Sequence, residues 1–153
     1  MATEARLAEL GLQLPAAPSP RGLYQPVVMV DKLVFTSGHL PVRSDGSVVT
    51  GCVGAELNED AGREAARLAG LALLASLRAA LGTLDQVRRL VKLVGWVRCT
   101  ADFKHQPAVL NGCSELLAQV FGPDRGIGAR SAIGVLSLPL GAAVEIEAVF
   151  QIE

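Results

Sequence analysis

Apolar residues recur with a helical period in two long segments of the chain. The clearer segment is Asn58–Leu81, where Asn58 can cap the first turn and Gly82 can end the last. Its predicted apolar face comprises Ala61, Ala65, Leu68, Ala72, Ala75 and Ala79, widened by Leu71, Leu74 and Leu77. The second segment is Leu110–Phe121, with a beginning nearer Phe103. The many alanines of the first helix predict close packing against a flat partner such as a sheet.

Alternating apolar and polar residues predict strands in the rest of the chain. In Val87–Thr100, one face is predicted to carry Val91, Leu93, Gly95, Val97 and Cys99. The last strand, Ala143–Ile152, places Val144, Ile146, Ala148, Phe150 and Ile152 on one face and Glu145, Glu147, Val149 and Gln151 on the other. Three further strands are predicted at Val27–Val30, Leu33–Ser37 and Ala129–Leu136.

The order of these elements, β-β-α-β-α-β-β, predicts an α+β domain with two helices packed on one sheet. This domain is expected to occupy residues 22–153, after an N-terminal part of residues 1–21. That part comprises a short helix, Thr3–Leu10, and a proline-rich connector that cannot be regular helix. The face without helices still carries Val94, Trp96 and Val149, so we expect part of it to meet another subunit.

Composition and charge exclude several classes of partner. Half of the 153 residues are hydrophobic, yet only 4% are aromatic, and the formal net charge is −1 without a run of Lys or Arg. A nucleic-acid or anionic-membrane surface is therefore not expected. The three cysteines have no metal-ligand spacing, and the N-terminus lacks the pattern of a secretory signal. We expect reduced thiols, a cytoplasmic location and no membrane span.

One arginine stands out in the C-terminal run from Gly128 to Ile152. Arg130 begins a predicted strand whose other residues are small or apolar, and Glu145 lies near the start of the next strand. A guanidinium in such surroundings needs an anionic partner, and its planar fork suits a carboxylate. From the residues alone, that carboxylate could belong to a ligand, or to Glu145 or Glu147 on the neighbouring strand.

Five short motifs resemble the Rid/YjgF family of reactive-intermediate (enamine/imine) deaminases, formerly called L-PSP endoribonucleases. They are G-L-Y-Q at Gly22–Gln25, F-T-S-G-H-L-P at Phe35–Pro41, A-D-F at Ala101–Phe103, A-R-S-A at Ala129–Ala132 and L-P-x-G-A-x-V-E-I-E-A at Leu138–Ala148. The similarity extends over nearly the whole chain, and its most specific part is the arginine motif combined with the last one.

The resemblance implies a chorismate-mutase-like fold assembled as a homotrimer around a central barrel, with clefts between subunits. By analogy with the deaminating members, Arg130 would grip the carboxylate of the substrate, Glu145 would orient the hydrolytic water and Tyr24 would close the cleft. Backbone groups around Ser37–Gly38 and the end of the strand near Thr100 would line it. A metal or organic cofactor is not implied.

The chain departs from the family pattern around this cleft. Tyr24 is followed directly by Gln25-Pro26, His39 stands where glutamine is common, and Ala132 replaces a frequent cysteine. We expect His39 and His105 to be surface or loop residues, and Cys113 to be a small residue of the core.

These observations predict a hydrolase that converts reactive 2-imino or 2-enamine acids to 2-keto acids and ammonia. A non-catalytic module that binds a small carboxylate is the alternative from another class, and a purely structural trimer is a further one. An endoribonuclease is disfavoured, because the chain is slightly acidic and poor in aromatic residues.

Overall fold

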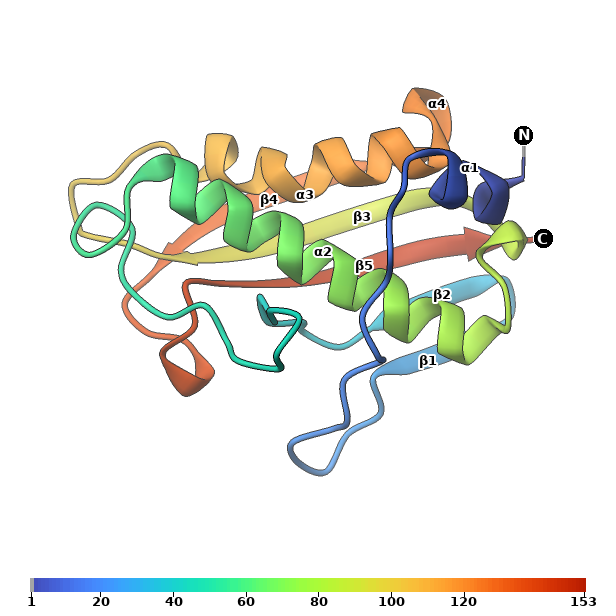
Figure 1. The fold of residues 1–153 in the computed structure, drawn as a ribbon, viewed down its shortest axis with the longest axis horizontal. Helices are drawn as coiled ribbons and strands as arrows, with labels where there is room; N and C mark the ends of the chain where they lie inside the picture. Colours follow the sequence, from blue (N-terminus) through green and yellow to red (C-terminus); the bar gives the residue numbers. More distant parts are fainter. Residues whose placement is uncertain (1) are drawn as a thin grey trace.

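A single five-stranded sheet forms the centre of the computed structural model, which describes residues 2–153. The strands are β1 (Val27–Val30), β2 (Leu33–Thr36), β3 (Val87–Arg98), β4 (Ala129–Val135) and β5 (Val144–Ile152). The long helices α2 (Glu59–Leu81) and α3 (Gln106–Phe121) lie across one face of this sheet (Figure 1). The predicted α+β architecture and the order of its elements are confirmed. Shorter elements are α1 (Thr3–Glu9), α4 (Pro123–Gly126), and the 3₁₀ turns η1 (Leu84–Gln86) and η2 (Pro139–Gly141).

The order of strands in the sheet is β1-β2-β5-β3-β4, so β4 forms one edge. Strands β3 and β4 are parallel and are connected through α3, whereas the other neighbours are antiparallel. The register places Arg130 beside Leu93 of β3, and Glu145 beside Trp96 of the same strand. Because successive side chains of a strand point to opposite faces, this register decides where both residues point.

Helix α2 begins and ends where its sequence predicts. The Asn58 side chain accepts a hydrogen bond of 2.8 Å from the Ala61 amide, and Gly82 follows the last turn with a φ of 81°. The predicted apolar face is partly wrong, because Ala79 is exposed and Ala61 is only half-buried. Every residue from 69 to 77 is buried instead, since the sheet, α3 and the core residues of the N-terminal segment enclose the middle of the helix.

The alternation of β3 is interrupted near its start. Leu90 is 2% exposed whereas Val91 is 39% exposed, although Val91 was predicted to share the buried face of Leu93. The pairing of β3 with β5 shifts between Leu90 and Lys92, which is the signature of a bulge. From Leu93 onward the predicted alternation holds, with Leu93, Gly95 and Val97 buried against the helices.

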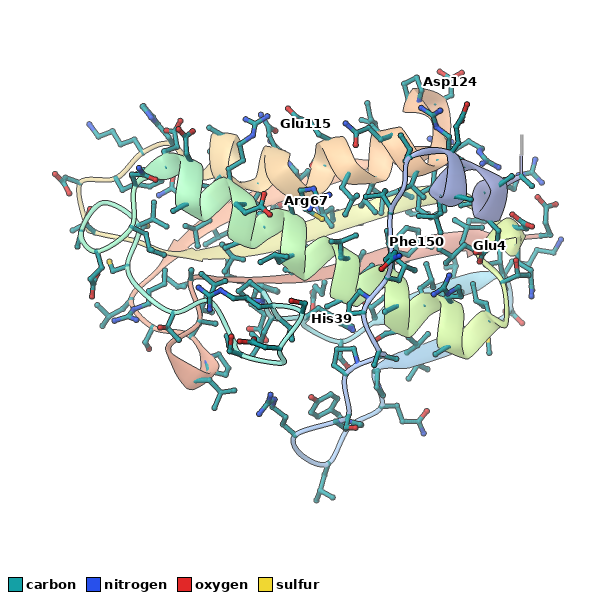
Figure 2. All side chains as sticks on the ribbon, viewed as in Figure 1. Glu4, His39, Arg67, Glu115, Asp124 and Phe150 are labelled. Carbon is teal, nitrogen blue, oxygen red and sulfur yellow. The ribbon has the colours of Figure 1, made fainter. Side chains whose placement is uncertain are left out.

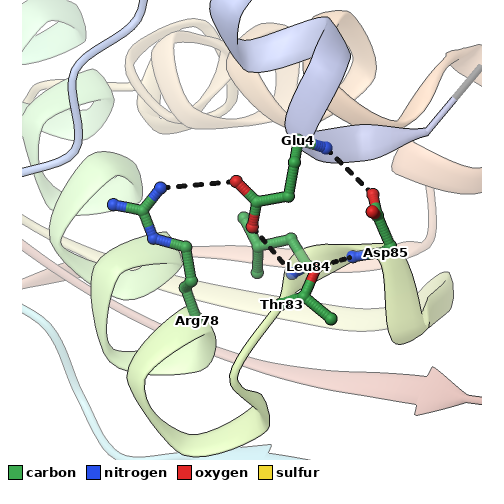
Figure 3. A network of polar contacts seen from close by, with 5 residues as sticks. All are labelled: Glu4, Arg78, Thr83, Leu84 and Asp85. Carbon is green, nitrogen blue, oxygen red and sulfur yellow. Dashed lines mark hydrogen bonds and ion pairs between the residues drawn. The ribbon is translucent and has the colours of Figure 1, made fainter.

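The N-terminal helix α1 is fastened to the turn that follows α2. The Glu4 carboxylate accepts hydrogen bonds from the Leu84 amide at 3.0 Å and from Arg78 at 3.4 Å, while the Glu4 amide donates to Asp85 at 2.9 Å (Figure 3). The connector then runs without regular structure from α1 to β1 and crosses α2 in the view of Figure 1. It thereby brings residues 16–24 beside the loop that follows β2.

The face of the sheet without helices is uncovered and carries several apolar side chains. Phe35 is 42% exposed and Ile133 is also 42% exposed, and Val94, Trp96 and Val149 are half-buried beside them. The assembly that would cover this face stays a prediction. None of the helices formed by residues 2–153 is both long and apolar enough to cross a bilayer.

Candidate active site

Arg130 points from the edge strand β4 toward helix α3. Its Nη1 donates to Asn111 Oδ1 at 2.8 Å and to Ser114 Oγ at 3.0 Å. None of the ion pairs formed within residues 2–153 includes Arg130. The alternative that this arginine pairs with Glu145 or Glu147 is therefore wrong for the single chain, because both glutamates lie on the opposite face of the sheet.

The two hydrogen bonds fix the Arg130 guanidinium from one side. Both use Nη1, so within residues 2–153 the Nε and Nη2 groups have no protein acceptor. These two groups form the parallel fork that suits a carboxylate. Since Arg130 is exposed, a ligand can reach the fork from solvent. Asn111 and Ser114 were not predicted as site residues, although their spacing of three places both on one face of α3.

A hollow of about 430 Å³ opens beside Arg130 between α3, β3 and the segment that leads into β4. Its walls are Leu90, Leu93, Asn111, Ser114, Glu115, Ala118, Gly126, Ile127, Gly128 and Arg130. The volume is within the usual range of small-molecule sites. Arg130 therefore combines an anchored guanidinium with room for a guest molecule.

Glu145 lies on the helix-free face near the start of β5. Burial raises the pKa of its carboxyl above the usual value, and the neighbouring Glu147 charge raises it further. The carboxylate lies against the loop after β2, where a side-chain carbon added to Gly38 would be 2.5 Å from Glu145 Oε1. Glycine at position 38 thus allows the carboxylate to contact the backbone of this loop.

Tyr24, Ser37 and Gly38 are brought together in a second hollow of about 450 Å³, between the N-terminal connector and the loop after β2. The Ser37 hydroxyl donates to the Gln25 carbonyl at 2.6 Å, and the Tyr24 hydroxyl accepts from the Arg21 amide at 3.0 Å. The first bond fastens the segment of Tyr24 to the loop, and the second lies within that segment. The Tyr24 side chain stays 47% exposed.

His39, labelled in Figure 2, lies in the loop after β2, in agreement with the prediction of a surface or loop residue, and it is buried there. Its Nδ1 lies 2.8 Å from the Ser37 carbonyl, and its Nε2 lies 2.7 Å from the Ser76 hydroxyl of α2. A carbonyl can only accept, so Nδ1 carries the proton and Nε2 accepts from Ser76. Burial lowers the pKa of His39.

Two further predictions agree with the structure. His105 is exposed, and its Nδ1 lies 2.7 Å from Glu59 Oε1. Cys113 is buried in the core, and this burial raises the pKa of its thiol to about 12.

Thr100 lies in a third region, beyond the end of β3, beside Phe103, Gln106 and Gly134. The structure therefore distributes the predicted residues over three regions of one chain: Arg130 beside α3, Glu145 with the Ser37–Gly38 loop, and Thr100 past β3. The sheet separates the first two regions. Chemistry that uses both Arg130 and Glu145 requires more than one copy of the chain.

Comparison with known proteins decides the family. The model of the family described as "YjgF/chorismate_mutase-like, putative endoribonuclease" matches residues 4–146. The chain belongs to the YjgF/Rid family. Protein TCP17 of Trypanosoma cruzi is 42% identical over 148 residues, which are 97% of this chain and 92% of that protein.

Two solved structures resemble the whole chain of this YjgF/Rid member. A protein of unknown function from Agrobacterium tumefaciens is 41% identical, covers 99% of this chain and 94% of its own, and has a TM-score of 0.89. A protein from Shewanella oneidensis described as "a putative endoribonuclease" is 29% identical, covers 99% of this chain and 100% of its own, and has a TM-score of 0.94. The similarity thus includes the N-terminal helix and connector.

Proposed function

We propose that this protein hydrolyses reactive 2-imino and 2-enamine acids to 2-keto acids and ammonia. The observation that carries the proposal is the state of Arg130, whose guanidinium is held by Asn111 and Ser114 while its Nε–Nη2 fork faces an open hollow. A fork without a protein carboxylate is suited to the carboxylate of a small acid. The family resemblance supplies the reaction class.

The reaction requires a water molecule to be activated beside C2 of the bound imine. Glu145 can accept a proton from this water as the water oxygen forms a bond to C2, and can pass it to the imine nitrogen, which gives a carbinolamine. The hydroxyl proton of the carbinolamine then moves to the nitrogen, again through Glu145, as the C2–N bond breaks. Ammonia leaves and the keto group remains. The raised pKa of Glu145 strengthens it as a base and keeps it able to return the proton.

Each complete site would consist of Arg130 from one subunit and Glu145 from a neighbour. This follows from the opposite faces on which the two side chains lie in one chain. The uncovered apolar face that carries Glu145, together with the unpaired edge of β4, offers surfaces on which copies could associate. The homotrimer expected for the family would provide three such sites.

The test is to generate 2-aminoacrylate in situ and to measure pyruvate release above the uncatalysed rate. Arg130→Ala should lose roughly a thousandfold in kcat/KM, because the carboxylate anchor is removed. Arg67→Ala is the matched control, since Arg67 is a partly exposed arginine of α2 whose one ion-pair partner within residues 2–153 is Glu64. Equal rates for wild type and Arg130→Ala, with both proteins folded, would discard the proposal.

The alternative of a non-catalytic carboxylate-binding module predicts a different pattern. Such a module would bind keto acids through Arg130 without accelerating imine hydrolysis. The substitution Glu145→Gln would then leave keto-acid binding unchanged. Isothermal titration with pyruvate, performed beside the rate assay, separates the two functions.

A further inference from the structure

We infer that His39 is a positioning residue of the proposed site, which orients the backbone amide of Gly38 toward the bound acid by holding the Ser37 carbonyl group. The inference deepens the proposed function and rests on it, because the loop after β2 is taken as part of the site that contains Glu145. His39 acts through the backbone of this loop and not by touching the ligand. The inference is carried by hydrogen bonds that connect the loop with helix α2.

The imidazole of His39 is held at both of its nitrogens inside the protein. The residue is 4% exposed, and its Nε2 lies 2.7 Å from the Ser76 hydroxyl of α2. Its Nδ1 lies 2.8 Å from the carbonyl oxygen of Ser37. Because that carbonyl can only accept, the Nδ1 proton is directed to Ser37 and the Ser76 hydroxyl donates to Nε2. Ser76 thereby holds the tautomer that the contact with Ser37 requires.

The backbone on either side of Gly38 is fixed by other bonds. The Ser37 amide donates to the Pro26 carbonyl at 2.8 Å, and the amides of His39 and Ile146 donate to each other's carbonyls at 2.7 Å and 3.0 Å. Within residues 2–153 the Gly38 amide itself donates no hydrogen bond. Glycine has more backbone freedom than any other residue. The orientation of the peptide between Ser37 and Gly38 therefore depends on the contact with His39.

This contact decides the direction in which the Gly38 amide points. In a trans peptide the carbonyl and the amide of the next residue point in opposite directions, and the peptide between Ser37 and Gly38 is trans. The carbonyl points to the imidazole, which lies against α2, so the Gly38 amide points away from α2. Glu145 lies on that helix-free side, and a side-chain carbon added to Gly38 would be 2.5 Å from its Oε1. A free donor and the proposed base thus meet at one glycine.

An unpaired amide that is fixed in this way suits an anionic group of a ligand. A donor oriented before binding needs no rearrangement when a carboxylate arrives, and a hydrogen bond to a charged group is one of the stronger kinds. The Gly38 amide would add a donor to the guanidinium that Arg130 of another copy supplies. Without the His39 contact the glycine peptide could rotate, and the donor would be lost although the groups that bind the ligand remained.

The binding test uses pyruvate, a stable product, and isothermal titration. His39→Leu keeps a side chain of similar size but removes the donor to Ser37, so pyruvate should bind about tenfold more weakly. His39→Asn places an amide nitrogen near the position of Nδ1 and should restore binding to within about threefold of the wild type. A role in core packing alone would favour leucine over asparagine. Leu77→Val, a buried substitution in α2, is the control for lost stability and should bind like the wild type.

The Gly38 amide resonance provides a second measurement, which needs no variant. In a proton–nitrogen correlation spectrum it should move as pyruvate is added to the wild type or to His39→Asn, and it should move little in His39→Leu. If His39→Leu does not fold, the wild-type spectrum still decides. A Gly38 resonance that stays in place at saturating pyruvate overturns the inference.

Turnover of 2-aminoacrylate separates this inference from the proposed function. Folded His39→Leu that binds pyruvate as tightly as the wild type, or His39→Asn that binds as weakly as His39→Leu, overturns the role of His39, while the deaminase function stands if Arg130→Ala loses activity. Binding that depends on His39 without any imine hydrolysis supports the oriented amide and overturns the deaminase function. If the wild type does not bind pyruvate, the role of His39 is overturned and the Arg130→Ala rates alone decide the function.

Discussion

Arg130 and Glu145 lie on opposite faces of one sheet, although they are only two strands apart. Arg130 pairs in register with Leu93, whose side chain is buried under the helices. Glu145 pairs with Trp96, whose side chain lies on the helix-free face. The distance between the two side chains within a chain is therefore set by the sheet itself. If both residues act on one substrate molecule, as proposed, they must come from different copies of the chain.

Substitution of Asn111 or Ser114, which hold Arg130, should raise the KM more than it lowers the kcat. Asn111→Ala and Ser114→Ala each delete one hydrogen bond from Nη1 and should raise KM about fivefold, because each of these solvent-exposed bonds contributes about 1 kcal/mol. The kcat should change by less than a factor of two. Steady-state kinetics on 2-aminoacrylate measure both, and an unchanged KM in the double variant would contradict the anchoring role.

Glu145→Gln should abolish turnover, and ionisation of Glu145 should give the wild-type pH–rate profile an acid limb. The folded-state pKa of Glu145 is raised, so in the wild type activity should fall as the pH decreases through a value above the ordinary glutamate pKa of about 4.3. A profile measured from pH 4.5 to pH 8 tests this. An acid limb that persists in an active Glu145→Gln variant would assign the base to another residue.

The same substitution should stabilise the protein at neutral pH. A carboxyl with a raised folded-state pKa favours folding below its unfolded pKa, and this contribution is lost as the pH rises through the folded pKa. Glu145→Gln removes the ionised, partly buried group, so its Tm should exceed that of the wild type at pH 7. The difference should vanish near pH 4, and a lower Tm at pH 7 would contradict the burial of this carboxylate.

His39 should make folding sensitive to mild acid. Its pKa is lowered in the folded state, so its contribution is present above the unfolded value of 6.5 and is lost as the pH falls below it. Protonation would also remove the acceptor that the Ser76 hydroxyl requires. Thermal unfolding between pH 7.5 and pH 5 should show a smaller loss of stability for His39→Gln than for the wild type.

Gly38→Ala should displace Glu145 without a general loss of structure. The added carbon would meet Oε1 at 2.5 Å, so the flexible glutamate must rotate away. Activity should fall at least tenfold, whereas Tm should change by only a few degrees. Ala55→Ser, in the exposed loop before α2, serves as a mild control. Full activity of Gly38→Ala would show that the contact is dispensable.

The sequence predicted elements from local patterns but not contacts that depend on register. Asn58 and Gly82 marked the ends of α2 correctly because capping is local. Val91 was assigned to the wrong face because a bulge before Lys92 resets the alternation, and the sequence carries no clear signal for it. The burial of His39 was not predicted, because its partner Ser76 is 37 residues away in the sequence.

In the candidate site, too, local motifs predicted residues, whereas contacts that depend on strand register were missed. The C-terminal motifs predicted Arg130 and Glu145 as site residues, and the motif at Phe35–Pro41 predicted Ser37 and Gly38. Asn111 and Ser114 were not recognised, because only the parallel pairing of β4 with β3 brings Arg130 beneath α3. The opposite orientation of Arg130 and Glu145 also required the register of three strands.

Complementation between two inactive variants tests most directly whether Arg130 and Glu145 of different copies form one site. Arg130→Ala and Glu145→Gln should each be inactive alone, and their co-expressed mixture should regain about a quarter of the wild-type activity with random assembly. That recovery arises where Arg130 of a Glu145→Gln chain meets Glu145 of an Arg130→Ala chain. Mixed assemblies, verified by mass spectrometry, that remain as inactive as the separate variants would contradict the two-subunit site.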